Sequence, residues 1–517
     1  MSEFEKGKGI SRRGFMKSAA IGAGAITLAA FPTSRVEAMP LPKKWEQTVD
    51  VLVMGAGGAG MMAAIQAHDA GAKVLVLHKT STVYSSSTAL SGGLFAVAGT
   101  RFQKEKGIQD TPAQYYEDVV KNGTYMNDPV LVKLLTENSV KVFEWLVDNG
   151  LPPFRLEPYA GHNILRGHRS NKNSGRDLVD TAFGQIKKRN IPVAFETAGD
   201  ALYVDPKSGR VLGVRAMKGK KAINIKARKA VVIASGGFTR DAKTFDAWVP
   251  AFSKVGTLTG DSANAGDGIK MAAKYAGSFL THINYTATYP YGLEVEPRNG
   301  PVCRYWYFTP IGGILVNKEG KRYINEDIPP TKLTTTLTTQ TDKVHYLIAP
   351  KGVWDEVFEK YPKGGVISPS TPESLEAEFK SGKVLFRADT IHNLAVKAGI
   401  NADNFEKTVA AYNGYVDAGK DPEFGRDAKF LKRKIEGPPY YAVKMTFATV
   451  LTLGGVKVNN NCQVMDPYDA VIPGLYAAGE AVGGVHGAIY LGGCALAWAH
   501  TSGYIAGKNA GKEKSAG

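Results

Sequence analysis

The stretch that decides the fold is Val51-Leu-Val-Met-Gly-Ala-Gly-Gly-Ala-Gly60. An apolar run typical of a β-strand ends at Met54, the spacing Gly55-x-Gly57-x-x-Gly60 follows, and a helix-forming segment comes next. In such a loop the first glycine permits a tight turn, the second lets the backbone approach a pyrophosphate, and the third lets helix and strand pack closely. The N–H groups and the positive dipole end of the helix would face the phosphates. The spacing alone is weak support, because a glycine-rich turn without a ligand can have it too.

The residues around this loop supply the context that the spacing requires. A second apolar strand, Lys73 to Leu77, follows the helix-forming segment. Residues 48–78 therefore predict a β-α-β unit with a phosphate-binding loop. Later segments predict helices over 129–148 and 176–186, strands over 193–195 and 229–237 and from residue 472, and an antiparallel meander over 199–228.

We predict an α/β protein in which a Rossmann-like domain is interrupted by an inserted one. Residues 268–392 break the strand and helix pattern, because they are rich first in aromatic residues, then in threonine, and then in scattered lysines. The pattern returns before Glu480. We therefore expect a nucleotide-binding domain in two parts, residues 39–267 and 393–517, with an α+β capping domain over 268–392 between them.

The composition excludes several classes of protein. The chain has 517 residues and a net charge of +16, but no basic run lies within a recognisable nucleic-acid-binding module. We therefore interpret the basic charge as a surface that attracts acidic protein partners, and we expect no nucleic-acid partner. The three cysteines, Cys303, Cys462 and Cys494, form no CxxC pair, which excludes a cysteine metal cluster or a CxxCH haem attachment.

The first 38 residues predict a twin-arginine export signal. Ser11-Arg-Arg-Gly-Phe-Met-Lys17 precedes an apolar stretch from Ser18 to Phe31, and Val36-Glu-Ala38 is a small-residue cleavage site. The apolar stretch is too short and too rich in glycine and alanine for a stable membrane span. We therefore expect export of the folded protein to the periplasm and removal of residues 1–38.

Further motifs accompany the glycine loop along most of residues 48–510. They are Ala234-Ser-Gly-Gly237, Ala265-Gly-Asp-Gly268, Gly313-Ile-Leu-Val-Asn317 with Arg322-Tyr-Ile-Asn-Glu326, Ala478-Gly-Glu480 with Gly483-Gly-Val-His-Gly487, and Leu491-Gly-Gly493. As a set they resemble the FAD-dependent fumarate reductase/succinate dehydrogenase flavoprotein superfamily, which includes 3-ketosteroid dehydrogenases and periplasmic flavocytochrome c-like reductases. The resemblance implies a Rossmann-like FAD domain with a mobile capping domain, and a substrate held between them against the flavin ring.

The resemblance also implies one FAD per chain. The glycines of the loop would hold the pyrophosphate, Glu480 would bond a ribitol hydroxyl, and the turn at Gly492-Gly493 would place a helix N-terminus near the flavin C2 carbonyl. Two positions depart from the pattern. His78 replaces the acid that bonds the ribose, and Ser86 replaces the histidine to which succinate dehydrogenases attach flavin, so we expect non-covalent binding. The residues implied to bind FAD are Gly55, Gly57, Ala59, Gly60, His78, Lys79, Ser86, Ser87, Gly92, Gly93, Val193, Ala234, Gly236, Asp267, Glu480, His486, Gly493, Ala495 and Leu496.

The residues with which fumarate reductases clamp a dicarboxylate are replaced. By resemblance, the clamp arginine matches Tyr490, the clamp histidine matches Leu451, and the proton-donating arginine matches Pro330. A buried dicarboxylate without paired charges would cost several kcal/mol. Fumarate and succinate are therefore poor candidate substrates.

Aromatic side chains crowd the start of the predicted capping domain instead. They favour a flat, apolar or aromatic substrate with one carbonyl or carboxylate, although the same rings could simply form the core of that domain. By resemblance to ketosteroid dehydrogenases, Tyr490 would bond the substrate carbonyl. The proton donor has no counterpart in this chain, and Tyr490, Lys332, Tyr307 and Arg304 are the candidates. The aromatic group comprises Tyr285, Tyr289, Tyr291, Tyr305, Trp306, Tyr307 and Phe308, with Arg304 among them.

We expect an exported FAD enzyme that transfers a hydride between flavin N5 and a C=C bond conjugated to a carbonyl or carboxylate. Reduction of an aromatic or apolar enone or enoate is the preferred direction, because the resemblance implies a terminal reductase of anaerobic respiration. Electrons would come from a separate protein such as a c-type cytochrome. Three alternatives stay open: a 3-ketosteroid dehydrogenase-like enzyme, an electron-transfer flavoprotein subunit without its own substrate, and an alcohol or amine oxidase.

Overall fold

The computed structural model describes residues 37, 39–159, 161–253, 256–258, 263–293, 302–328, 330–360, 367–368 and 371–515. Apart from Glu37, the predicted export signal lies outside the described residues. Among the residues that are described, no helix is long and apolar enough to cross a membrane. The same residues contain no group of His, Cys, Asp and Glu side chains that could hold a metal ion.

The predicted β-α-β unit is confirmed. β1 (Gln47–Met54) carries the glycine loop at its carboxyl end, α2 (Gly58–Asp69) follows the loop, and β2 (Val74–Leu77) pairs with β1 in parallel. The core of β1 is completely buried, as expected for a parallel strand covered on both faces. The first sheet has the order β20-β21-β9-β1-β2-β6, in which the further strands are β6 (Val193–Ala194), β9 (Lys221–Ile233), β20 (Gln463–Met465) and β21 (Val471–Ala477).

The other expected elements of this part of the chain are also present. β7 (Thr197–Val204) and β8 (Val211–Lys218) pair antiparallel with each other, and β8 pairs antiparallel with β9, which confirms the meander. The two expected helices are α6 (Pro129–Asp148) and α7 (Arg176–Lys188). The shorter helices here are α3 (Ser87–Leu90), α4 (Arg101–Glu105), α5 (Pro112–Asn122), α8 (Ala242–Trp248) and α9 (Asp267–Ala276).

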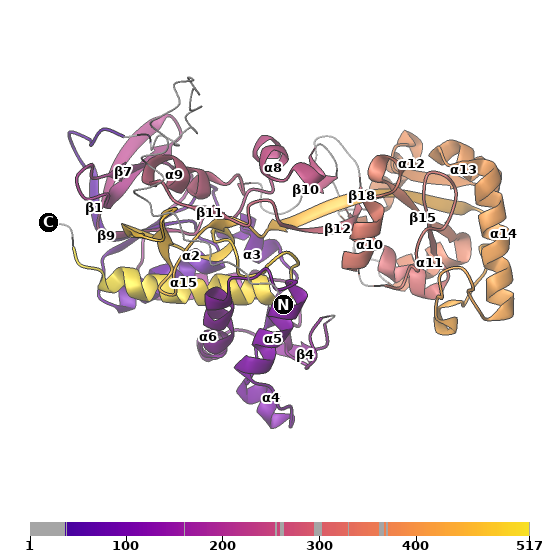
Figure 1. The fold of residues 1–517 in the computed structure, drawn as a ribbon, viewed down its shortest axis with the longest axis horizontal. Coiled ribbons are helices and arrows are strands. Elements are labelled where there is room, and N and C mark those ends of the chain that lie inside the picture. The colour runs from indigo at the N-terminus through magenta and orange to yellow at the C-terminus, as the bar shows by residue number, and fades with distance from the viewer. Residues whose placement is uncertain are drawn as a thin grey trace, which may run out of the picture. The chain divides into compact units, whose positions relative to one another are not determined.

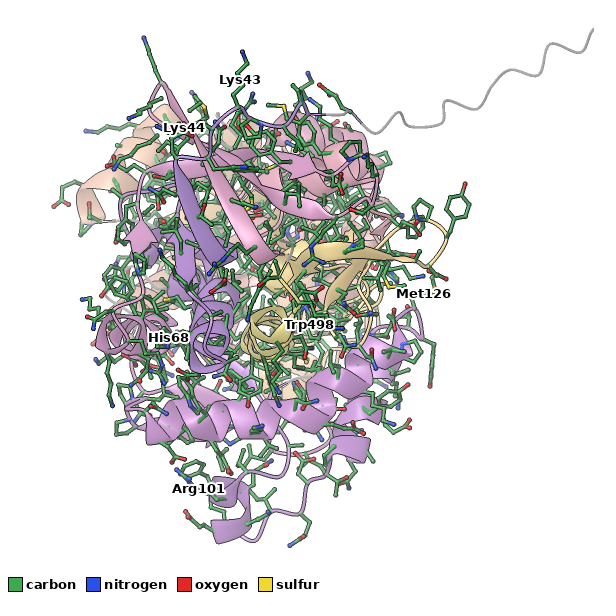
Figure 2. All side chains as sticks on the ribbon, turned by 90° about the vertical axis from the view of Figure 1, so that its left-hand side faces the viewer. Lys43, Lys44, His68, Arg101, Met126 and Trp498 are labelled. Carbon is green, nitrogen blue, oxygen red and sulfur yellow. The ribbon has the colours of Figure 1, made fainter. Side chains whose placement is uncertain are left out.

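The last helix, α15 (Cys494–Lys512), packs directly on α2, as Figure 1 shows. A Cβ atom added to Gly503 would lie 2.2 Å from the carbonyl oxygen of Ala59. One added to Gly507 would lie 2.1 Å from the carbonyl oxygen of Ala63. Only glycine permits this approach of the two backbones. Trp498 anchors α15 in the core, and Figure 2 shows its side chain inside the molecule, whereas Lys43 and Lys44 extend outward.

A second sheet begins after the first part of the nucleotide-binding domain. Its central strand is the long β18 (Tyr440–Thr452), which pairs with β12 (Thr286–Gly292) and with β15 (His345–Pro350). The sheet has the order β14-β15-β18-β12-β13-β16, and β10 and β17 also pair with β18. These other strands are β10 (Thr257–Leu258), β13 (Val302–Cys303), β14 (Ile314–Val316), β16 (Ile367–Ser368) and β17 (Leu385–Ala388).

The second sheet continues past residue 392, where we expect the capping domain to end. β18 belongs to this sheet and ends only at Thr452. α13 (Ile391–Ala398) and α14 (Ala402–Ala418) also pack with this part of the chain, beside the second sheet in Figure 1. The sequence of residues 393–440 does not predict this packing, because the pattern of an amphipathic helix does not show which sheet the helix covers. The remaining helices here are α10 (Pro330–Leu337), α11 (Lys351–Lys360) and α12 (Pro372–Ser381).

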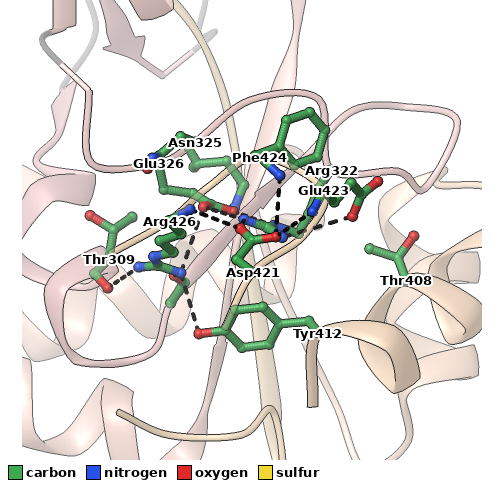
Figure 3. Close-up of polar contacts among 12 residues, drawn as sticks. Thr309, Arg322, Asn325, Glu326, Thr408, Tyr412, Asp421, Glu423, Phe424 and Arg426 are labelled. Atoms are coloured by element: carbon green, nitrogen blue, oxygen red, sulfur yellow. Dashed lines mark hydrogen bonds and ion pairs between the residues drawn. The ribbon is translucent and has the colours of Figure 1, made fainter. Parts of the chain in front are cut away.

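Two buried arginines hold together the loops beside the second sheet (Figure 3). Arg322 pairs with Glu326 at 2.8 Å and with Asp421 at 2.8 Å, and all three side chains are completely buried. Arg426 pairs with Asp327 at 2.7 Å. The segment after β14 is therefore fixed to residues about one hundred positions later by charge-assisted hydrogen bonds.

Besides the two large sheets, β11 (Leu280–Thr281) and β19 (Gly455–Val456) form a two-stranded sheet, and three further strands form what we call the small third sheet. β3 (Leu94–Ala96) and β4 (Phe154–Glu157) each pair antiparallel with β5 (Gly167–Ser170). The connection from β4 to β5 contains Tyr159 and His162, and Arg166 directly precedes β5. Arg166 is completely buried and forms ion pairs with Asp110, at 2.8 Å, and with Asp118.

Candidate active site

A cavity of about 760 Å³ opens at the carboxyl ends of β1, β2 and β9. Its lining comes from the glycine loop, from the segment that leads into α15, and from strands β12, β13 and β18 of the second sheet. Ligands of α/β proteins bind at this end of a parallel sheet. The cavity is therefore the candidate site for both a nucleotide cofactor and a substrate.

The glycine loop has the geometry that phosphate binding requires. Gly55 has a φ of +111°, and a Cβ atom there would lie 2.2 Å from the carbonyl oxygen of Ala234. Gly57 precedes the first turn of α2 and lines the cavity without a side chain. The N–H of Gly58 donates to Thr88 Oγ1 at 3.0 Å. Gly60 does not line the cavity, and it lets α2 approach Gly55, because a Cβ atom there would lie 1.8 Å from the carbonyl oxygen of Gly55.

His78 lines the cavity, but both of its ring nitrogens have protein partners. Nδ1 accepts a hydrogen bond from the N–H of Ala56 at 3.3 Å, so Nε2 carries the proton and lies 2.9 Å from the carbonyl oxygen of Thr82. The ring therefore joins the glycine loop to the loop after β2. The ring lines the cavity with these bonds in place, and the contact of His78 with the cofactor stays a prediction.

Glu480 and Asn264 form a buried polar group on the cavity wall. The carboxylate of Glu480 accepts from the N–H of Thr452 at 2.9 Å and from Asn264 Nδ2 at 3.2 Å. Burial raises the pKa of Glu480, and these hydrogen bonds oppose the rise. The amide oxygen of Asn264 is buried and has no hydrogen-bond partner in the described part of the chain. A hydroxyl-bearing ligand such as a ribityl chain fits this acceptor.

The segment before α15 presents a helix N-terminus and a neutral histidine to the cavity. Gly493 adopts a φ of +83°, and α15 starts at the next residue. Burial lowers the pKa of His486 to about 3, so its imidazole is neutral at physiological pH. His486 Nδ1 is buried without a hydrogen-bond partner among the described residues. A polar ring system bound beside His486 would form a hydrogen bond with Nδ1. The dipole of α15 favours negative charge at its N-terminus.

These features fit FAD. The glycine loop, the unpartnered buried atoms of Asn264 and His486, and the α15 N-terminus line one continuous cavity. Of the residues that the resemblance assigns to the cofactor, only Gly60, Gly93 and Val193 do not line it. Gly93 supports the loop instead, since a Cβ atom there would lie 2.5 Å from the carbonyl oxygen of Ser174. Val193 lies in the short edge strand β6, and residues 197–199 line the cavity next to it.

The side of the cavity toward the second sheet is aromatic. Tyr291 and Arg304 come from β12 and from the end of β13, Tyr490 comes from the loop before α15, and Tyr159 comes from the connection between β4 and β5. Burial raises the pKa of each of these tyrosines, and the neighbouring Tyr159 phenol raises those of Tyr291 and Tyr490 further. They are therefore neutral phenols at physiological pH. Tyr159 was not among the predicted site residues, because nothing in its sequence context marks it.

The candidate proton donors fall into three groups. Tyr490 and Arg304 line the cavity. Tyr307 does not, because it lies in a short helical turn (Tyr305–Tyr307) and packs against a buried apolar cluster that includes residues of the second sheet. Lys332 lies in α10, and its side chain is outside the described part of the structure. Tyr305 and Phe308 are buried in the same apolar cluster, so this part of the aromatic run is core.

Comparison with known proteins agrees with this site. Residues 50–496 match the family described as FAD binding domain. The cytochrome fumarate reductase of Shewanella frigidimarina is 34% identical over 469 residues, which cover 90% of this chain and 77% of that protein. Urocanate reductase of Eggerthella lenta is 31% identical over 494 residues, which cover 92% of this chain and 77% of that protein.

A solved structure shows the same fold. The open conformation of a flavocytochrome c3 fumarate reductase aligns with a TM-score of 0.76 and 30% identity, over 90% of this chain and 79% of that one. The fold class, the FAD cofactor and the oxidoreductase class predicted from the sequence are thus confirmed. The chain belongs to the FAD-dependent fumarate reductase/succinate dehydrogenase flavoprotein superfamily, whose members in these comparisons act on carbon–carbon double bonds.

Proposed function

We propose that this enzyme reduces the C=C bond of an aromatic or apolar enoate, and that fumarate is not its physiological substrate. The observation that carries the proposal is the composition of the substrate side of the cavity. Three tyrosines and Arg304 line it, and Leu451 lies where a clamp histidine is expected. Arg304 suits one carboxylate, whereas the tyrosines and Leu451 would offer a second carboxylate only neutral or apolar groups in place of its hydration.

When bound, FAD supplies the redox chemistry by exchanging a hydride at N5. The protein has two tasks in the reduction of an enoate. It must hold the carboxylate so that negative charge can develop as the hydride reaches the β-carbon, and it must allow a proton to reach the α-carbon. Arg304 is the candidate for the first task, because its guanidinium is always charged and is a strong hydrogen-bond donor.

Tyr490 supports the reaction as a hydrogen-bond donor. Its phenolic oxygen accepts the N–H of Gly493 at 3.0 Å, and no described residue accepts its own proton. Burial raises the pKa of Tyr490, so the phenol keeps its proton at neutral pH and is a weak acid. It is therefore suited to polarise a substrate oxygen, and less suited to deliver the proton to carbon.

We further propose that electrons arrive from a separate protein, such as a c-type cytochrome, and that the enzyme works in the periplasm after twin-arginine export. The relative in Shewanella frigidimarina is named a cytochrome fumarate reductase, which supports an electron donor of this class. The motif at residues 11–17 supports the export. Cell fractionation tests the export: activity in the periplasmic fraction that is lost on Arg12→Lys with Arg13→Lys is expected, and activity that stays in the cytoplasm contradicts it.

A reoxidation screen tests the proposed function. Photoreduced enzyme is mixed without oxygen with cinnamate-like enoates, short enoates, dicarboxylates and steroid enones, and the return of oxidised flavin absorbance is followed. We expect the cinnamate-like compounds to reoxidise the flavin fastest. Reoxidation by steroid enones alone would favour the 3-ketosteroid dehydrogenase alternative, and reoxidation by none would favour an electron-transfer subunit.

A further inference from the structure

Tyr159 lies against the turn that leads into α15. A Cβ atom added to Gly492 would lie 1.9, 2.3 and 2.7 Å from three atoms of the Tyr159 ring. The ring therefore rests directly on the backbone of Gly492 and requires glycine at that position. Tyr159 is 41% exposed and lines the cavity together with Tyr291 and Tyr490. It thus presents an aromatic face to the space where a substrate would lie.

A hydrogen bond from His162 fixes the same contact. Arg166 Nη1 lies 3.3 Å from His162 Nδ1, and a guanidinium can only donate, so Nδ1 is the acceptor. The proton is therefore on Nε2, which donates to the carbonyl oxygen of Gly492 at 2.8 Å. Burial lowers the pKa of His162, and its bond to Gly492 opposes this, so the ring is neutral at physiological pH.

Buried charges hold this histidine in place. Arg166 is completely buried, and it pairs with Asp110 at 2.8 Å and with Asp118. Asp118 also accepts a hydrogen bond from the N–H of Asn163 at 3.0 Å, next to His162. The reaction described above uses none of these groups. They form a rigid support that runs from the interior to the Gly492 turn.

We propose that Tyr159 is the residue that selects substrates with an aromatic ring, and that His162 positions it. The inference rests on the proposed reduction of aromatic enoates and deepens it. The substrate ring packs against the Tyr159 face on one side of the cavity, while Arg304 holds the carboxylate on the side of the second sheet. Aromatic rings in contact favour offset or edge-to-face arrangements, which a fixed wall can impose.

The experiment compares two probe substrates, cinnamate and acrylate, with reduced methyl viologen as electron donor. Tyr159→Ala should lower kcat/KM for cinnamate roughly 10–100-fold, mainly through KM, and change that for acrylate by about twofold at most. Tyr159→Phe keeps the ring and should keep the selectivity. Tyr468→Ala is the matched control, because Tyr468 is 90% exposed and lies outside the cavity lining.

His162 is tested by a pair of variants. His162→Ala removes the donor to Gly492 and should raise KM for cinnamate with a smaller change in kcat, and His162→Gln, which keeps an N–H donor, should restore part of the loss. Equal losses for both substrates in Tyr159→Ala would mean that the ring is only packing, and no loss for cinnamate would mean that the ring does not contact it. Either result overturns the inference.

A binding measurement separates this inference from the proposed function. Cinnamate is titrated into the oxidised enzyme and the flavin absorbance change gives Kd. Turnover of cinnamate that does not depend on Tyr159 contradicts the inference alone. Binding that weakens in Tyr159→Ala without any turnover by the native enzyme supports the inference and contradicts the proposed function.

Discussion

The backbone N–H of Gly493 donates a hydrogen bond to the phenolic oxygen of Tyr490 at 3.0 Å. The bond joins a residue of the substrate side to the turn that starts α15. Because this turn also faces the cofactor wall, the position of the Tyr490 ring and the position of the helix N-terminus are coupled. A substrate oxygen that accepts the Tyr490 proton would therefore be aligned relative to the flavin.

Tyr490→Phe keeps the ring and removes the donor. We expect normal FAD binding and a fall in the rate of substrate reduction of about 100–1000-fold, which is the typical loss of one donor to a developing negative charge. Stopped-flow reoxidation of photoreduced enzyme measures this. If the variant loses FAD instead, the bond to Gly493 supports the cofactor site, and the proposed role in polarising the substrate is wrong.

Arg304→Gln removes the charge that we assign to the substrate carboxylate. Loss of a hydrogen bond between charged groups costs about 1.5–3 kcal/mol, which corresponds to a rise in KM for an enoate of about 10–100-fold. The methyl ester of the same enoate is the control, because it has no negative charge and its KM should change little. Equal rises in KM for the acid and the ester would show that the substrate carboxylate does not contact Arg304.

FAD should be bound without a covalent link. Ser86 is buried, and its hydroxyl donates to the carbonyl oxygen of Val83 at 2.7 Å. A serine hydroxyl does not form the bond that a histidine nitrogen forms with the flavin. Precipitation with acid should release the yellow colour into the supernatant, and colour that stays with the pellet after washing would contradict the prediction.

The fold around the glycine loop could be predicted from the sequence, because the loop, the apolar strands and the amphipathic helices each have local periodicity. α6 begins and ends at the expected residues. The place of β18 in the second sheet could not be predicted, since it joins the sheet only through pairing with strands distant in sequence.

The residues on the aromatic side of the cavity could also be predicted only in part from the sequence. Tyr490 could be identified because it adjoins a recognisable motif, and Tyr291 belongs to a dense aromatic run. Tyr159 stands alone in sequence and reaches the cavity through the small third sheet, so only the structure reveals it. The aromatic run itself divides between core, at Tyr305 and Phe308, and cavity, at Tyr291.

The buried ion pairs beside the second sheet should matter for stability. Asp421→Asn leaves Arg322 without one of its two close carboxylate partners in a completely buried position. Removal of one partner of a buried pair typically costs about 3–5 kcal/mol, which urea denaturation would measure. Glu376→Gln, which breaks the exposed pair with Arg387, is the control and should cost under about 1 kcal/mol. Equal small losses of unfolding free energy in Asp421→Asn and Glu376→Gln would show that the buried pairs contribute little to stability.

The same carboxylate predicts a loss of stability in acid. Burial raises the pKa of Asp421, but the hydrogen bond and charge of Arg322 outweigh it and hold the pKa below its usual value of 3.8. A carboxyl group whose pKa is lower in the folded state contributes stability above its unfolded pKa, and this contribution is lost as the pH falls through the folded pKa. Below about pH 4, the urea concentration at the midpoint of denaturation should therefore decrease in the native protein as the pH falls. In Asp421→Asn this midpoint should change less with pH. Parallel pH profiles would contradict this.

The most direct test of the proposed substrate class is the steady-state rate with cinnamate and with fumarate, measured side by side with reduced methyl viologen. We predict turnover of cinnamate at a rate typical of enzymes, roughly 1–1000 per second, and a kcat/KM for fumarate at least about 100-fold lower. The difference follows from Leu451 and Tyr490 in place of clamp residues and from Arg304 as the cation beside Tyr291. Fumarate turnover at an equal or higher kcat/KM would contradict the account.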